Sequence, residues 1–159
     1  MTATAHTLVA GAIAQAIPDP IIAPILALTS HFIMDSVPHW DFGTEWRSRS
    51  KFATGAIAIT DTVVGLTLGF LIFRNSTPAL PLTLSLFASI LPDWLEAPWY
   101  IFFASQNRIG PKKGAKIFEK FLYSIYQVQN KLHSKAKFPL GAITTVTTVL
   151  FFFLLLKVF

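Results

Sequence analysis

The chain has 159 residues, of which 53% are hydrophobic and 13% charged, and it carries a formal net charge of +5. A soluble domain usually has about a quarter charged residues, so the composition argues against an ordinary water-soluble globule and indicates a membrane protein. The chain has no cysteine, which excludes disulfides and thiolate metal sites. The length fits one domain, and we expect no cleaved signal peptide because the first basic residue is Arg47.

Apolar stretches separated by turn residues predict an all-α, polytopic membrane protein with about five membrane-associated helices. The first two stretches form a helical hairpin over residues 5–38, because Pro18 and Pro20 stop helix formation between them. Its first arm is short for a span, which normally takes about 20 residues. Further membrane helices are expected over residues 52–73, 79–103 and 139–157, all within a single integral-membrane domain, residues 1–159.

The segment 104–138 is basic and lies between the last two membrane helices. Apolar residues recur there at helical intervals, and lysines occupy other positions. This pattern predicts an amphipathic helix that either lies in the membrane interface or packs on the membrane domain. The apolar positions are Phe118, Phe121, Leu122, Ile125 and Leu132.

The basic residues predict an orientation with the N-terminus in the cytoplasm. Only Arg74 and Lys157 then lie outside, and the other eleven of the 13 basic residues lie inside. We expect many of them to face anionic lipid headgroups, so the positive charge does not require a nucleic-acid partner. The inside residues are Arg47, Arg49, Lys51, Arg108, Lys112, Lys113, Lys116, Lys120, Lys131, Lys135 and Lys137.

Six ionisable residues lie inside apolar segments, where charge is costly and a functional role is the default interpretation. On the predicted topology, five of them converge at a similar depth near the cytoplasmic ends of their helices, and Asp61 lies somewhat deeper. The six are His6, His31, Asp35, Asp61, Asp93 and Glu96.

His31 and Asp35 are four residues apart, so they share a helix face and can bind one ion together. Pro38 then ends the helix, which frees His39 and Asp41 to fold back over the same site. Farther along, Pro92 is expected to disturb the helix before Asp93, with Glu96 one turn later. Nitrogen and oxygen donors of this kind suit zinc, manganese or iron.

Structural interpretations of the same residues stay open. His31 and Asp35 could simply form a hydrogen-bonded pair on one helix. Asp93 could cap a helix, and Asp61 could form a hydrogen bond between helices. His133 is interpreted as a solvated surface residue, although it could cover the site.

Two further features leave alternatives open. Arg108, Lys112 and Lys113 could neutralise a phosphate or simply face lipid headgroups. The pair Gly65-x-x-x-Gly69 leaves open both oligomerisation and packing within the chain.

Two blocks of the chain resemble a known family. Residues 4–41, "TAHTLVAGAIAQAIPDPIIAPILALTSHFIMDSVPHWD", resemble the start of small bacterial membrane-bound metal-dependent hydrolases, and "ASILPDWLEAP" is similar to their Leu-Pro-Asp element. The group is distantly similar to zinc-dependent phospholipase C proteins. The resemblance implies a bacterial inner-membrane location and a divalent metal, zinc above all. It implies His6, His31, Asp35 and Asp93 as metal ligands, with His39 as a fifth.

The resemblance favours a hydrolase that acts on a phospholipid or another membrane phosphoester at the cytoplasmic interface. A bound metal would activate water and polarise the phosphoryl oxygen, with His39 or Glu96 as the catalytic general base or acid. The alternative is a membrane protein that handles metal ions or protons without hydrolysis. A purely structural cluster ranks third, because polar contacts between membrane helices contribute little stability.

Overall fold

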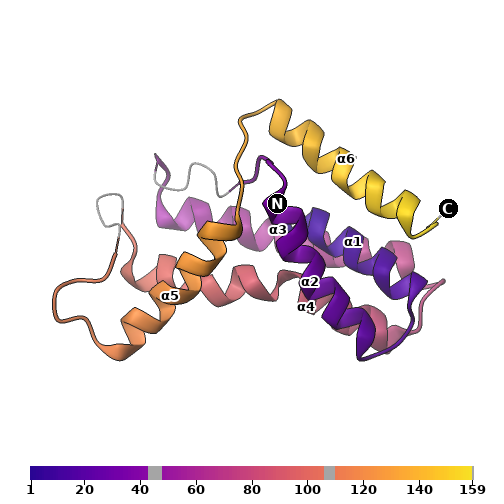
Figure 1. Ribbon diagram of the computed structural model, residues 1–159, viewed down its shortest axis with the longest axis horizontal. Helices are drawn as coiled ribbons and strands as arrows, with labels where there is room; N and C mark the ends of the chain where they lie inside the picture. Colours follow the sequence, from indigo (N-terminus) through magenta and orange to yellow (C-terminus); the bar gives the residue numbers. More distant parts are fainter. Residues whose placement is uncertain (43–47, 106–109, 159) are drawn as a thin grey trace.

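The computed structural model describes residues 1–42, 48–105 and 110–158. In these ranges the chain forms six α-helices and one short π-helix, so the all-α prediction is confirmed (Figure 1). The helices are α1 (Ala3–Ala16), α2 (Ile22–Ser36), α3 (Lys51–Phe73), α4 (Ala79–Pro98), the π-helix η2 (Trp99–Phe103), α5 (Ile117–Leu132) and α6 (Leu140–Leu155).

Helix α1 forms the centre of the bundle and contacts α2, α3, α4 and α6. It is rich in alanine, and most of its side chains are buried. Small residues let helices approach closely, and α3 places Gly65 and Gly69 against Thr4 and Thr7 of α1. The glycine pair of α3 therefore packs within the chain.

The turn between α1 and α2 forms where the two prolines predicted it. The Asp19 carboxylate accepts hydrogen bonds from the backbone N–H groups of Ile21 and Ile22, both at 2.8 Å. The bonds from Ile22 and Ile21 hold the pKa of this exposed carboxyl below its ordinary value of 3.8. The side chain thereby satisfies N–H groups that the start of α2 leaves without a helical partner.

Helix α4 runs through Pro92 to Pro98 and passes directly into η2, so the helix continues past the proline that was expected to disturb it. A proline inside a helix removes one backbone hydrogen bond and disturbs the preceding turn. Ser89 lies in that turn, and its carbonyl oxygen accepts a hydrogen bond from Nδ1 of His31 at 2.7 Å. The disturbed turn of α4 thus holds a side chain of α2.

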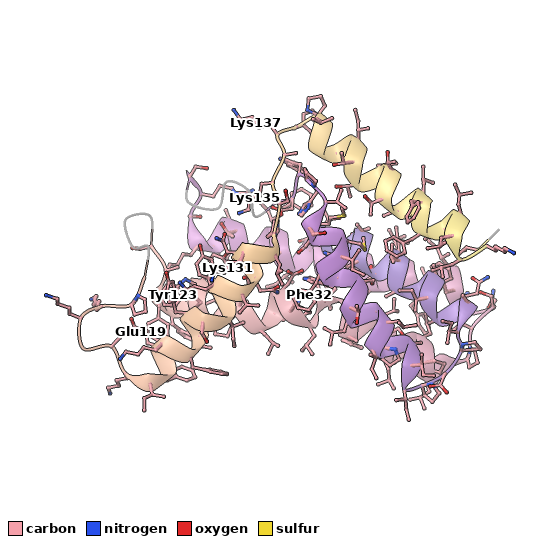
Figure 2. All side chains as sticks on the ribbon, in the orientation of Figure 1. Phe32, Glu119, Tyr123, Lys131, Lys135 and Lys137 are labelled. Carbon is pink, nitrogen blue, oxygen red and sulfur yellow. The ribbon has the colours of Figure 1, made fainter. Side chains whose placement is uncertain are left out.

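Helix α5 is the predicted amphipathic helix, and one side of it packs in a separate aromatic cluster. Trp99, Leu122, Tyr123 and Tyr126 meet there, at the junction of η2 and α5. Other apolar side chains of α5 are exposed, including Ile117 and Phe121. Figure 2 shows Lys131, Lys135 and Lys137 along the end of α5 and the linker that leads to α6.

Among the described helices, α3 alone is both long and apolar enough to cross a membrane. The helices α2 and α6 are apolar but shorter. Most large apolar side chains on α2, α3, α4 and α6 nevertheless point away from the core and are exposed. The structure therefore shows a helical bundle with an apolar exterior and one candidate membrane span.

Candidate metal centre

All four histidines of the chain lie at one end of the bundle, together with three aspartates. Two groups of three residues have ligand atoms that lie within 4.8 Å of one another. The first group is His6, His31 and Asp93, and the second is Asp35, His39 and His133. Both groups could hold a metal ion.

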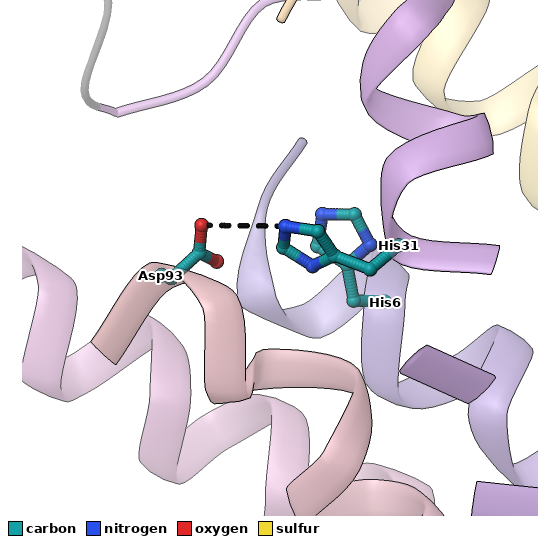
Figure 3. A group of neighbouring side chains, drawn as sticks. All are labelled: His6, His31 and Asp93. Carbon is teal, nitrogen blue, oxygen red and sulfur yellow. Dashed lines mark ion pairs between the residues drawn. The ribbon is translucent and has the colours of Figure 1, made fainter. Parts of the chain in front are cut away.

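The first group joins three helices. Figure 3 shows His6 of α1 stacked on His31 of α2, with Asp93 of α4 facing the two rings. The ring centroids are 4.1 Å apart, and Asp93 Oδ1 lies 3.7 Å from His31 Nε2. Both imidazoles are fully buried, whereas the Asp93 side chain is 38% exposed. Asp93 therefore forms the open side of this group.

The second group combines the end of α2 with the linker before α6. His39 lies just after α2, and His133 just after α5. The main chain holds the two segments together, because His39 N–H donates to the Ser134 carbonyl at 3.2 Å and Ala136 N–H donates to the His39 carbonyl at 2.7 Å. Ser134 N–H also donates to the Asp35 carbonyl at 2.8 Å.

Asp35 lies between the two groups and is close to every histidine. Its Oδ1 is 3.2 Å from His6 Nε2 and 3.6 Å from His39 Nε2. Its Oδ2 is 3.4 Å from His31 Nε2 and 3.5 Å from His133 Nδ1. Each oxygen thus faces one histidine of each group. The Met1 amine also contacts Oδ1.

The hydrogen bonds of the histidines leave nitrogen lone pairs inside the site. Carbonyl oxygens only accept, so His31 Nδ1 carries a hydrogen toward Ser89 O, and His39 Nδ1 carries one toward Val37 O, both at 2.7 Å. The Nε2 atom of each neutral ring then holds a lone pair. These two Nε2 atoms and both His6 nitrogens are buried without an aligned hydrogen-bond partner among the described residues.

This pattern fits a divalent metal. A metal-binding histidine typically donates its second ring N–H to a carbonyl or carboxylate, which fixes the tautomer that coordinates. A buried polar atom without a partner is costly in a folded protein, and a cation would satisfy these nitrogens. The donor set is nitrogen and carboxylate oxygen, which suits zinc and other first-row metals.

Asp41 orients His133 from outside the two groups. His133 Nε2 donates to Asp41 Oδ2 at 2.8 Å, which leaves the lone pair of the neutral ring on Nδ1, toward Asp35. Burial alone would raise the pKa of Asp41, but the hydrogen bond from His133 and the nearby ring of His39, whose Nε2 lies 3.3 Å from Asp41 Oδ2, outweigh it and hold that pKa well below its ordinary range. Asp41 therefore stays ionised beside the centre.

Asp61 holds α1 in place and belongs to neither group. Its carboxylate accepts from Ala3 N–H at 2.6 Å and from the Thr4 hydroxyl at 2.7 Å. A carboxylate at a helix N-terminus also interacts favourably with the helix dipole. Asp61 thus matches the interhelical contact that the sequence left open, and it fixes the turn that carries His6.

The structure brings together the four residues that the family resemblance implies as ligands, but it divides them between two groups. Their role as metal ligands stays a prediction. Glu96 lies in neither group. Its side chain forms a hydrogen bond with Tyr100 and interacts electrostatically with the Asp93 carboxyl group. The catalytic roles predicted for His39 and Glu96 also stay predictions.

For His133 the sequence favoured a solvated surface position and left open that the residue covers the site. Its side chain is 20% exposed and lies in the centre, instead of on the solvated surface. Its position after an amphipathic helix carries no periodic signal that points inward. Asp41 does fold back toward the site, as Pro38 predicted, and there it contacts His133.

The basic residues considered for phosphate binding lie away from the centre or outside the described residues. Lys112 and Lys113 line a cavity of about 320 Å³ near the start of α5, together with Phe103 and Phe118. Arg108, the third of these residues, lies outside the described residues, as does Arg47, which was predicted to lie on the cytoplasmic side.

Comparisons of the chain with protein-family models, with curated proteins and with solved structures found no match. The chemistry of this centre therefore has to be inferred from its own residues. The likeness of residues 4–41 and 88–98 to membrane-bound hydrolases remains an expectation.

Proposed function

We propose that the chain is a membrane-embedded, metal-dependent hydrolase that acts on a phospholipid or another phosphoester at the cytoplasmic interface. The observation that carries this proposal is the set of buried histidine nitrogens that face Asp35 at 3.2–3.6 Å and have no aligned hydrogen bond among the described residues. A purely structural cluster would pair those nitrogens with hydrogen-bonding groups, since unpaired buried polar atoms destabilise a fold.

The apolar exterior supports a polytopic membrane position. Leu154 on α6 is 80% exposed and Leu80 on α4 is 60% exposed, and α3 buries few side chains besides Gly65, Gly69 and Phe73. Water would make such faces unfavourable, whereas lipid would not. Helix α1 is short for a membrane span, but it does not need to cross the bilayer because neighbouring helices surround it.

The distribution of basic residues between the two ends of the bundle supports the proposed orientation. The end opposite the centre joins α1, the α3–α4 turn and the C-terminal residues, through hydrogen bonds from Ser76 to Gln15 and from Gln15 to Val158. Arg74 and Lys157, the two basic residues expected outside, lie in these segments. The centre lies at the opposite end, beside the basic linker and α5, and would therefore face the cytoplasm.

A divalent cation at this centre would activate a water molecule and polarise a phosphoryl oxygen. His6, His31, Asp35 and Asp93 would hold it, and the half-exposed Asp93 marks the side from which substrate enters. Hydrolysis transfers a water oxygen to phosphorus and releases an alcohol. His39 or Glu96 would accept the proton of the water and return one to the alcohol oxygen. A centre at the interface lies at the depth of lipid phosphates.

Metal analysis of the purified protein tests the proposal first. We expect stoichiometric zinc, manganese or iron in the wild type and its loss in a folded His31→Ala, Asp35→Ala double variant. Asp19→Ala, at the opposite end of the bundle, is the matched control and should keep its metal. A screen for release of an alcohol or a phosphomonoester from phospholipid vesicles follows. Bound metal without hydrolysis would favour a metal-handling role, and absence of metal after reconstitution would refute the proposal.

A further inference from the structure

We propose that this centre holds two divalent cations, one in each group, with the carboxylate of Asp35 between them. This inference rests on the proposed metal centre and specifies how many ions it holds. It also assigns His39, just after α2, and His133, in the linker after α5, as ligands of the second ion, which leaves Glu96 as the general base or acid of the proposed hydrolysis.

The number of donors favours two ions over one. A protein-bound zinc ion takes about four ligands, one of which is water in a catalytic site. The two groups offer four histidines and two aspartates, which exceeds what one such ion can use. A single ion would leave buried nitrogens without partners, at the cost that the fold otherwise avoids.

The position of Asp35 favours the same conclusion. Oδ1 faces His6 of the first group and His39 of the second, and Oδ2 faces His31 and His133 in the same way. A carboxylate so placed can give oxygen lone pairs to an ion on either side. An ion in each group would share the Asp35 carboxylate, and two-metal hydrolytic centres use a pair of ions to hold both the attacking and the leaving oxygen.

The second group is prepared for coordination by its neighbours. Asp41 accepts the Nε2–H of His133, and Val37 O accepts the Nδ1–H of His39. The lone pairs of the two neutral rings therefore lie on His133 Nδ1, which faces Asp35, and on His39 Nε2, which lies 3.6 Å from Asp35 Oδ1 and 3.3 Å from Asp41 Oδ2. Each ring therefore presents one nitrogen lone pair for the ion and donates its other N–H to a fixed acceptor.

Charge balance is also consistent with two ions. Asp35 and Asp41 are buried, and Asp93 is half-buried beside them. Buried carboxylates without counter-charges are strongly unfavourable. Two divalent cations and the Met1 amine that contacts Asp35 bring five positive charges to three carboxylates, and the two remaining positive charges suit the anionic oxygens of a phosphoester.

Zinc stoichiometry of the detergent-purified full chain tests the inference. We expect two Zn²⁺ per chain in the wild type after dialysis and one in either His133→Ala or His31→Ala. We expect none when His133→Ala and His31→Ala are combined. Lys131→Ala, at the end of α5, is the control and should keep two. Circular dichroism checks that each variant is helical, and Asp93→Asn replaces His31→Ala if the latter does not fold.

The possible outcomes separate this inference from the proposed function. One Zn²⁺ in the wild type, lost in both single variants, would mean a single shared ion and would overturn the inference while leaving a metal-dependent hydrolase intact. Two Zn²⁺ retained in His133→Ala would overturn the assignment of the second position. No Zn²⁺ at all would refute the metal centre itself. Substitution with Co²⁺ gives a second readout, because two ions joined by a carboxylate couple magnetically in electron paramagnetic resonance.

Discussion

His133 Nδ1 lies 3.5 Å from Asp35 Oδ2, although one residue follows α5 and the other belongs to α2. Backbone hydrogen bonds between residues 35–39 and 134–136 hold this contact in place. The linker after the basic amphipathic helix is therefore part of the centre. Any movement of α5 against a membrane surface would act directly on the position of His133.

Asp41 is expected to control metal affinity through His133. In Asp41→Ala the ring loses the carboxylate that fixes its tautomer, and loss of such a partner typically weakens metal binding about 10–100-fold. Isothermal titration of the purified protein with Zn²⁺ measures the effect. Asp41→Asn retains an accepting oxygen and should recover part of the affinity. Equal affinities in the wild type and Asp41→Ala would show that Asp41 does not orient a ligand.

Asp61 is expected to stabilise the bundle without affecting the chemistry directly. Asp61→Ala leaves the Ala3 N–H and the Thr4 hydroxyl without their acceptor, which should cost about 1–3 kcal/mol of unfolding free energy. Thr60→Ala, at an exposed neighbouring position, should change stability little. Denaturant unfolding in detergent compares the two. A destabilisation by Thr60→Ala as large as that by Asp61→Ala would contradict this role.

Gly65 and Gly55 provide a matched pair on α3. A Cβ at Gly65 would lie 2.8 Å from the Cα of Thr4, so Gly65→Ala should separate α1 from α3 and destabilise the protein by about 1–3 kcal/mol. A Cβ at Gly55 meets nothing within 4 Å, and Gly55→Ala should be neutral or stabilise the helix by roughly 0.5–1 kcal/mol. Thermal unfolding of both variants checks the contrast, and a stable Gly65→Ala would refute the close packing.

The exposed face of α6 tests the membrane proposal. Val146 is 60% exposed, and in water Val146→Asp would be harmless. In a bilayer an aspartate at mid-helix costs about 2.5–3.5 kcal/mol, so we expect less protein in the membrane fraction. Gln127→Asp, at an exposed position of α5, is the control. Normal fractionation of Val146→Asp would argue against a lipid-facing α6.

The sequence by itself determined the helices and one half of the centre. Apolar periodicity, prolines and the four-residue spacing of His31 and Asp35 act over a turn or two of helix, so they can be interpreted without knowing what packs against them. Membrane topology also predicted that His6 and Asp93 would come to the same end.

Only the tertiary structure decided the other half. His133 reaches Asp35 through backbone pairing of two extended segments, and such pairing leaves no periodic pattern in the side chains. The division of the ligands into two groups depends on which oxygen of Asp35 each imidazole faces, a property of packing. The continuation of α4 through Pro92 is a further case, because contacts with neighbouring helices outweigh the local preference against it.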